Sequence, residues 1–154
     1  MIESVINTPV TLTSNSSNVI FTVDDYRSRS ANCNCNCNSW LQHTQGSPLY
    51  KILKGGTYEI DLSAVATSGT AGIVALGLYQ DGILIPNTIS AATVTAGDLA
   101  NVSFNKKIRV CCNANTTLTV ASVPTVNAGA TGTTATATQV PIITNAIFGI
   151  EKRA

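Results

Sequence analysis

Three cysteines alternate with asparagines in the string Asn32-Cys33-Asn34-Cys35-Asn36-Cys37-Asn38, and their thiols are the side chains best suited to do chemistry. In an extended chain all three would point to one side, at intervals of about 6.6 Å. That spacing is too wide for a relaxed disulfide between neighbours in the series. The string therefore allows three interpretations: reduced thiols, thiolates that bind a metal, or disulfides to Cys111, Cys112 or another subunit.

Cys33, Cys35 and Cys37 are the candidate metal ligands, because sulfur suits zinc and other soft metals. Their spacing does not match a zinc finger, in which paired ligands are set about two to four residues apart. A metal would therefore need further ligands, for example from another subunit. The chain has five cysteines, an odd number, so within one chain at least one thiol stays unpaired.

Catalytic residues are not expected, and the protein is predicted not to be an enzyme. His43 is the single histidine, and the sequence has no Gly-x-Ser-x-Gly motif to supply a nucleophile. A dyad between His43 and one of the three thiols would need an orienting partner and a concave site. The adjacent carboxylates Asp24 and Asp25 lack the pattern of a calcium loop and are expected to cap a strand.

The composition predicts an all-β protein of one domain. Thr and Val, which fit a pleated strand, are frequent in the 154 residues, together with Asn, Gly and Ser, which suit turns. Only 11% of the residues are charged, against about a quarter in a typical domain. The net charge of +1 argues against nucleic-acid binding, and a surface so poor in charge suits a chain that lies inside an assembly.

Short strands separated by turn residues predict an antiparallel sandwich of jelly-roll type. The strands are expected at 10–13, 19–23, 49–54, 57–65, 73–80, 83–85, 89–95, 99–110, 117–123 and 140–151. Asp81-Gly82 predicts a two-residue hairpin turn with positive φ at both positions. The residues expected in the core or between subunits are Tyr58, Ile60, Leu62, Leu76, Leu78, Phe104, Ile108, Leu118 and Val120.

Two segments do not have the pattern of a core: the polar residues 24–48 and the low-complexity residues 127–139. Residues 1–47 are expected to hold N-terminal strands and the polar Cys/Asn loop, and either to add strands or to reach a neighbouring subunit. Residues 48–154 are expected to form the jelly-roll domain. Trp40 would either anchor a partner or pin the long loop to the sandwich.

Three motifs follow one another in a fixed order. Gly55-Gly56-Thr57-Tyr58 begins a strand, Tyr79-Gln80-Asp81-Gly82 ends another in a hairpin, and Ala96-Gly97-Asp98 marks a later turn. In order and spacing they resemble tumour-necrosis-factor-like and complement-globular-head-like domains over residues 48–151. The resemblance implies a homotrimer of jelly rolls that does binding or structural work and has no active site.

The expected setting is the exterior of a bacteriophage particle. Residues 1–7 have neither the basic start nor the apolar run of a secretory signal, and the apolar stretches fall far short of the ~20 residues that span a membrane. By analogy of fold, these features favour a virion structural protein made in the host cytoplasm: a capsid decoration, head-fibre or fibre-tip component. Its partners would be itself and capsid or fibre proteins, with no nucleic acid or membrane. The alternative is a bacterial spore- or cell-surface head that binds a carbohydrate or protein ligand.

Overall fold

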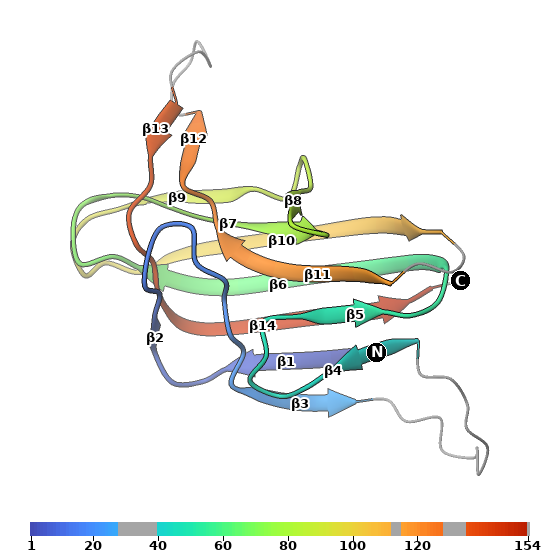
Figure 1. Ribbon diagram of the computed structural model, residues 1–154. Helices are drawn as coiled ribbons and strands as arrows, with labels where there is room; N and C mark the ends of the chain where they lie inside the picture. The colour runs from blue at the N-terminus through green and yellow to red at the C-terminus, as the bar shows by residue number, and fades with distance from the viewer. Residues whose placement is uncertain (28–39, 112–114, 128–134, 154) are drawn as a thin grey trace.

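The computed structural model describes residues 1–27, 40–111, 115–127 and 135–153, which form two antiparallel sheets packed face to face (Figure 1). Sheet A has the strand order β10-β6-β14-β1-β3, with β2 also paired to β14. Sheet B has the order β4-β5-β11-β7-β8, with β9 also paired to β7. A separate two-stranded unit, β12-β13, stands away from both sheets. Among the described residues, no helix is long and apolar enough to cross a membrane.

The strands that build sheet A are β1 (Ile2–Ile6), β2 (Val10–Thr11), β3 (Val23–Arg27), β6 (Gly56–Thr67), β10 (Ala100–Val110) and β14 (Ile142–Lys152). Those that build sheet B are β4 (Leu41–His43), β5 (Tyr50–Ile52), β7 (Gly72–Gln80), β8 (Ile83–Leu84), β9 (Ser90–Val94) and β11 (Thr116–Ser122). The separate unit consists of β12 (Thr125–Asn127) and β13 (Ala135–Ala137).

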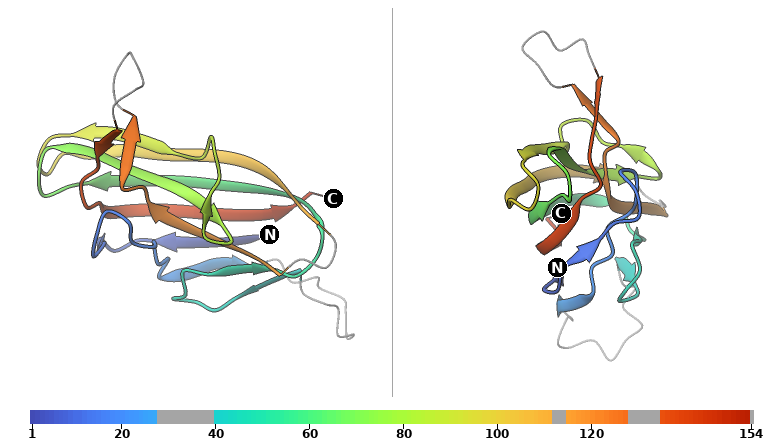
Figure 2. Two further views of the ribbon diagram at one scale, coloured as in Figure 1. Left: turned by 45° about the horizontal axis from the view of Figure 1, so that its top comes forward. Right: turned by 90° about the vertical axis from the view of Figure 1, so that its left-hand side faces the viewer.

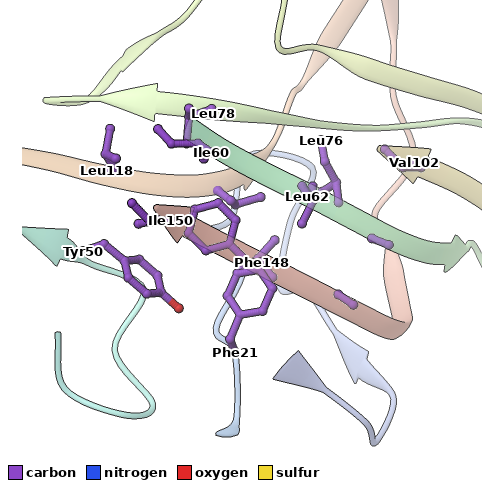
Figure 3. Close-up of a cluster of buried hydrophobic side chains, with 14 of the residues drawn as sticks. Phe21, Tyr50, Ile60, Leu62, Leu76, Leu78, Val102, Leu118, Phe148 and Ile150 are labelled. Carbon is purple, nitrogen blue, oxygen red and sulfur yellow. The ribbon is translucent and has the colours of Figure 1, made fainter. Parts of the chain in front are cut away.

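The core fills the space between the sheets with alternate side chains of each strand (Figure 3). Phe21, Tyr50 and Phe148 form an aromatic group at its centre, with ring centroids 5.0–6.5 Å apart. The predicted core residues are buried, except that Phe104 is only partly buried against the cluster. The residues predicted for the core therefore lie on the inward face of β6, β10 and β11.

The predicted all-β jelly roll is confirmed, and the long strands lie within one or two residues of their expected bounds. Asp81 and Gly82 have φ values of 51° and 80°, as the predicted hairpin turn requires. The segment 19–23 is different: it is strand only from Val23, because Val19 and Phe21 enter the core along an irregular crossing segment. β12 ends and β13 lies within the low-complexity segment 127–139, for which no strand was predicted.

Residues 1–47 add strands to both sheets. β1 pairs with β14 and β3 in sheet A, and β4 pairs with β5 in sheet B. The expected polar segment 24–48 therefore contains strand at both of its ends, and its described residues are not all exposed. Trp40 is partly buried, and its ring lies 5.3 Å from that of Tyr58, so it packs against the sandwich.

Gly77 lies in the middle of β7, on the face of sheet B that points away from the core, and the side chains of Leu84 and Val123 cover it. A Cβ atom there would lie 2.7 Å from Leu84 Cδ1 and 3.0 Å from Val123 Cγ2. We expect Gly77→Ala to lower the free energy of unfolding by about 1–3 kcal/mol, because a methyl group would overfill this contact. Urea unfolding measures this, with Gly69→Ala as the matched control, since a Cβ at Gly69 meets nothing within 4 Å. Equal stability of the two variants would contradict the close packing at Gly77.

Candidate functional site

The predicted thiol site at Cys33, Cys35 and Cys37 lies outside the described residues, as does Cys112. Cys111 follows directly after β10 and is an exposed free thiol. Within the described ranges, no group of three or more His, Cys, Asp or Glu side chains could hold a metal ion. Metal binding by the three cysteines therefore stays a prediction.

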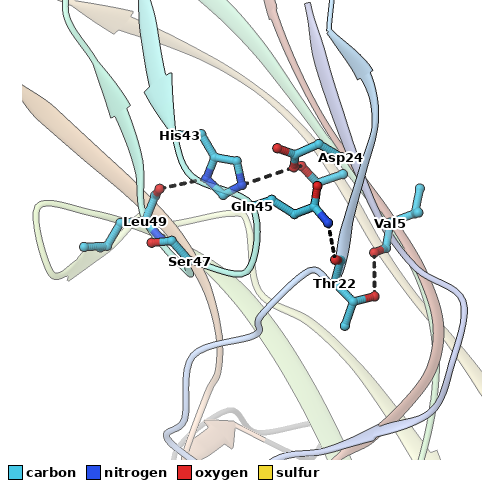
Figure 4. A network of polar contacts seen from close by, with 8 residues as sticks. Val5, Thr22, Asp24, His43, Gln45, Ser47 and Leu49 are labelled. Carbon is cyan, nitrogen blue, oxygen red and sulfur yellow. Dashed lines mark hydrogen bonds and ion pairs between the residues drawn. The ribbon is translucent and has the colours of Figure 1, made fainter.

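His43 is buried in a polar network where β3 of sheet A meets β4 of sheet B (Figure 4). Its Nδ1 atom lies 2.9 Å from the carbonyl oxygen of Leu49. Its Nε2 atom lies 3.2 Å from the carboxylate of Asp24, and both side chains are almost fully buried. The imidazole also stacks on Tyr50, with ring centroids 3.8 Å apart. A residue expected in a polar loop is thus part of the contact between the sheets.

Asp24 also accepts a hydrogen bond from the Ser4 hydroxyl, at 2.6 Å. Serine, aspartate and histidine are the residues of a hydrolytic triad, but the order is different here. In a triad the histidine lies between the serine and the carboxylate, so that it can take the hydroxyl proton. Here Asp24 lies between Ser4 and His43, and the hydroxyl donates to the carboxylate. The network therefore suits the joining of two sheets better than the activation of a nucleophile.

Charge is distributed very unevenly along the sandwich. Both termini lie at the same end in Figure 1, and the strand register places most charged residues in that half. The charged residues found there are Glu3, Asp24, Asp25, Arg27, Lys51, Lys54, Glu59, Asp61, Asp81, Lys106, Lys107, Arg109, Glu151, Lys152 and Arg153. The opposite end, here called the distal end, is formed by the turns at 7–9, 68–71, 95–99 and 138–141.

The distal end has one charged residue among those described, Asp98, whose carboxylate accepts a hydrogen bond from the Thr95 hydroxyl. Leu99 and Val140 are exposed at this end. One of the four turns at this end, 138–141, lies in the run 111–150, which contains no Asp, Glu, Lys or Arg. Overall composition does not reveal this run, because the whole chain is poor in charge. Depletion of charge is typical of the centre of a protein interface.

The outer face of sheet A, which points away from the core, is likewise divided into a charged half and an uncharged half. Val5, Ile147, Ser63 and Ser103 form one row across four neighbouring strands on the side nearer the distal end. Ile147 lies on the central strand β14 and is 45% exposed. A solvated sheet face normally carries polar side chains at its centre. An uncharged row with an exposed isoleucine at its centre is therefore the candidate contact surface of this sheet.

The other half of this face carries a network of ion pairs and hydrogen bonds around Glu59. Asn105 Nδ2 donates to Glu59 Oε1 at 3.1 Å and also to Asp61. Arg153 Nε donates to Glu59 Oε2 at 2.7 Å, and Arg153 Nη2 lies 3.2 Å from Glu151. The hydrogen bond from Asn105, followed in size by that from Arg153, lowers the pKa of Glu59. The bond to Glu59 in turn raises the pKa of Arg153.

We expect the Glu59 network to add a small stability that is lost in acid. Because the folded-state pKa of Glu59 is lowered, its contribution is present above the ordinary glutamate pKa and disappears as pH falls through the lowered value. The melting temperature of Glu59→Gln should thus lie slightly below that of the wild type at pH 7, and the two should converge in acid. Glu3→Gln, on β1 of the same sheet, is the control. A difference between wild type and Glu59→Gln that persisted unchanged at low pH would contradict this assignment.

The fold is that of the tumour-necrosis-factor-like and C1q-like jelly rolls, which confirms the predicted resemblance. The globular domain of zebrafish complement 1qA protein superposes with a TM-score of 0.61 and 9% identity, over 99% of this chain and 96% of its own. A crystal structure of murine APRIL gives 0.54 and 12%, over 95% of this chain and 97% of its own. The likeness thus extends beyond residues 48–151 to the N-terminal strands. No protein-family model matches the sequence, and no curated protein matches it.

Proposed function

We propose that the protein is a homotrimeric structural head with no enzymatic activity, in which the outer face of sheet A joins the subunits. The observation that carries this proposal is the uncharged row Val5–Ile147–Ser63–Ser103 at the centre of a sheet face. A monomer would gain solubility from charges at such positions. In the trimer that the family resemblance implies, this row would be buried between subunits.

A closed trimer also suits the chemistry of the rest of the face. The carboxylates of Glu59, Asp61 and Glu151 lie beside Lys107 and Arg153, so this half contains both signs of charge and can stay hydrated at the rim of a contact. The uncharged half would lie in the contact itself. A ring closed by rotation limits association to a fixed number of subunits.

The setting that we propose is the outside of a bacteriophage particle, where the trimer would be a capsid decoration, head-fibre or fibre-tip component. What supports this setting is the combination of a jelly-roll head, a chain with 11% charged residues and a distal end almost without charge, which suits docking on another protein. The support is an analogy of fold and surface rather than a site.

The oligomeric state and the biological setting are tested separately. Light scattering on the purified protein should give three times the chain mass of 16.0 kDa. A folded monomer at micromolar concentration would overturn the trimer. Genes for capsid and tail proteins beside this gene would support the virion setting, whereas sporulation or surface genes would favour a bacterial surface head.

Zinc at Cys33, Cys35 and Cys37 is a separate proposal, with further ligands supplied by another subunit. Replacing the three cysteines together by serine should then remove bound zinc and loosen the trimer, because losing a structural metal removes folding free energy directly. Metal analysis by mass spectrometry and light scattering would measure the two effects. Wild-type protein that contains no metal and a variant of unchanged mass would show that the thiols are inert.

A further inference from the structure

The turn between β7 and β8 contains the dipeptide Asp81-Gly82, whose two residues can react with each other. An aspartate side chain can close onto the amide nitrogen of the next residue, and glycine hinders this closure least because it has no Cβ atom. A Cβ atom at Gly82 would meet nothing within 4 Å, so no neighbouring group packs against it there. Both residues are also exposed to water. Sequence and surroundings therefore leave this dipeptide open to reaction.

The other aspartates of the chain are less suited to this reaction. Each precedes a residue with a side chain that hinders ring closure, in the pairs Asp24-Asp25, Asp25-Tyr26, Asp61-Leu62 and Asp98-Leu99. Asp98 has the most similar setting, because it too is exposed in a turn. It is therefore an internal reference for Asp81.

In the folded protein the Asp81 carboxylate is bound by Thr117 of β11, which runs alongside β7 up to this turn (Figure 2). The Thr117 amide donates to Oδ1 of Asp81 at 2.8 Å, and the Thr117 hydroxyl lies 3.2 Å from the same oxygen. In the opposite direction, the Asp81 amide donates to the Thr117 carbonyl at 2.9 Å. One residue thus binds both the backbone and the side chain of Asp81.

This arrangement directs the carboxyl group away from Gly82. In a regular antiparallel pair the two residues exchange both of their N–H···O=C bonds. Asp81 has a φ of 51° and turns the chain toward β8, so its carboxylate takes the place of its carbonyl as the acceptor for Thr117. The carboxyl group therefore points across to β11, whereas ring closure needs it to turn along the chain onto the Gly82 nitrogen.

We propose that Asp81-Gly82 is a site of spontaneous isomerisation, and that Thr117 protects it while the turn is folded. In the reaction, the Gly82 nitrogen bonds to Cγ of Asp81 and loses its proton, and the carboxyl hydroxyl leaves as water. Water then adds to the main-chain carbonyl carbon of Asp81 in the cyclic imide and breaks the bond from that carbon to nitrogen. The product is isoaspartate, which has the same mass as aspartate.

The modification would damage the outer face of sheet B. Isoaspartate adds a carbon to the backbone and shortens the side chain, so it cannot keep both the tight turn and the bonds to Thr117. The strand after the turn carries Leu84, whose Cδ1 atom would lie only 2.7 Å from a Cβ atom at Gly77. Displacing this strand would uncover Gly77. The proposal concerns a single chain and does not depend on the proposed trimer.

Peptide mapping after prolonged incubation at neutral pH tests the proposal, with one sample folded and another unfolded in urea. Trypsin cleaves after Lys54 and Lys106, and the resulting peptide 55–106 contains Asp61, Asp81 and Asp98. Mass spectrometry with electron-transfer fragmentation locates isoaspartate within it. In urea we expect Asp81 to convert faster than Asp61 and Asp98, and in the folded protein we expect this excess to be lost.

Thr117→Val and Thr117→Ser form the matched pair of variants, because only serine keeps the hydroxyl. The carboxyl group must leave Thr117 before it reacts, and losing one hydrogen bond raises the open fraction about fivefold. Conversion of Asp81 in folded Thr117→Val should rise by that factor, while Thr117→Ser should convert at the wild-type rate. Asp98 should keep its rate in both variants, which separates local opening from unfolding of the whole chain.

Three results would overturn the proposal. If Asp81 converts no faster than Asp98 in urea, the dipeptide is not a labile site. If wild-type Asp81 converts as fast when folded as in urea, Thr117 does not protect it. If Thr117→Val keeps the wild-type rate, or Thr117→Ser converts as fast as Thr117→Val, the hydroxyl has no part in the protection. The comparison of folded and unfolded wild type stands even if a variant fails to fold.

Discussion

Truncating Phe148 to alanine is expected to lower the free energy of unfolding by about 3–5 kcal/mol, the range for a buried phenylalanine. Phe148 is fully buried on β14, a central strand of sheet A. Its ring stacks on Phe21 at 5.2 Å and meets the edge of Tyr50 at 5.0 Å, so it joins sheet B to the N-terminal crossing segment. Removing the ring would leave a cavity between sheet A, sheet B and the crossing segment, and a shift of any one of them would not fill it.

Urea unfolding at one fixed protein concentration would measure the change, since any association makes stability depend on concentration. Phe104→Ala is the matched control: it removes the same kind of ring from the same sheet but from a partly buried position on the edge strand β10. Its cost should be clearly smaller. Equal losses in the two variants would contradict the central place of the Phe21–Tyr50–Phe148 group. A loss for Phe148→Ala as large as the whole ~5–15 kcal/mol of a typical domain would leave the protein unfolded, and Phe148→Leu would then supply the measurable step.

The sequence predicts the long strands well because their signal is local. In β6, the alternation of Tyr58, Ile60 and Leu62 with Glu59 and Asp61 fixes the inward face without knowledge of its neighbours. The Asp81-Gly82 turn is equally local, since a two-residue hairpin needs positive φ at both residues. Where the signal lies within a few residues, prediction and structure agree.

The strands that were missed depend on distant partners. β1 is a strand because β14 and β3 flank it, and β14 lies at the far end of the chain. β4 is held by β5 and by the buried contact between His43 and Asp24. Its three residues are too few to show a period of two. A polar residue such as His43 is predicted to be exposed unless the carboxylate that accompanies it into the interior is known.

The candidate surface was also hidden from the sequence. Ile147 falls in an apolar stretch, 146–150, in which core and surface positions look alike. Only the register places it in one row with Val5, Ser63 and Ser103 and shows that this row is exposed. The prediction of an assembly rests on a shortage of charge, which does not locate the surface that would form the contact.

Placing a carboxylate in that row should dissociate the proposed trimer. In Ile147→Asp, each subunit would carry a charge into a contact that excludes water, and burying a carboxylate without a partner is costly. Because Ile147 is 45% exposed in the single chain, the substitution should leave the fold of the subunit intact. We therefore expect light scattering to show a threefold fall in mass without loss of the β-sheet circular dichroism spectrum.

Ile83→Asp makes the same chemical change at a residue that is 74% exposed on sheet B, and its mass should match that of the wild type. Ser103→Asp provides an independent test, because it enters the same row from β10 and removes no apolar surface. If both row variants dissociate while the control does not, the contact lies on the outer face of sheet A. If Ile147→Asp and Ser103→Asp keep the wild-type mass, that face is open to solvent and the subunits meet elsewhere, because no trimer buries three unpaired carboxylates at its centre without weakening.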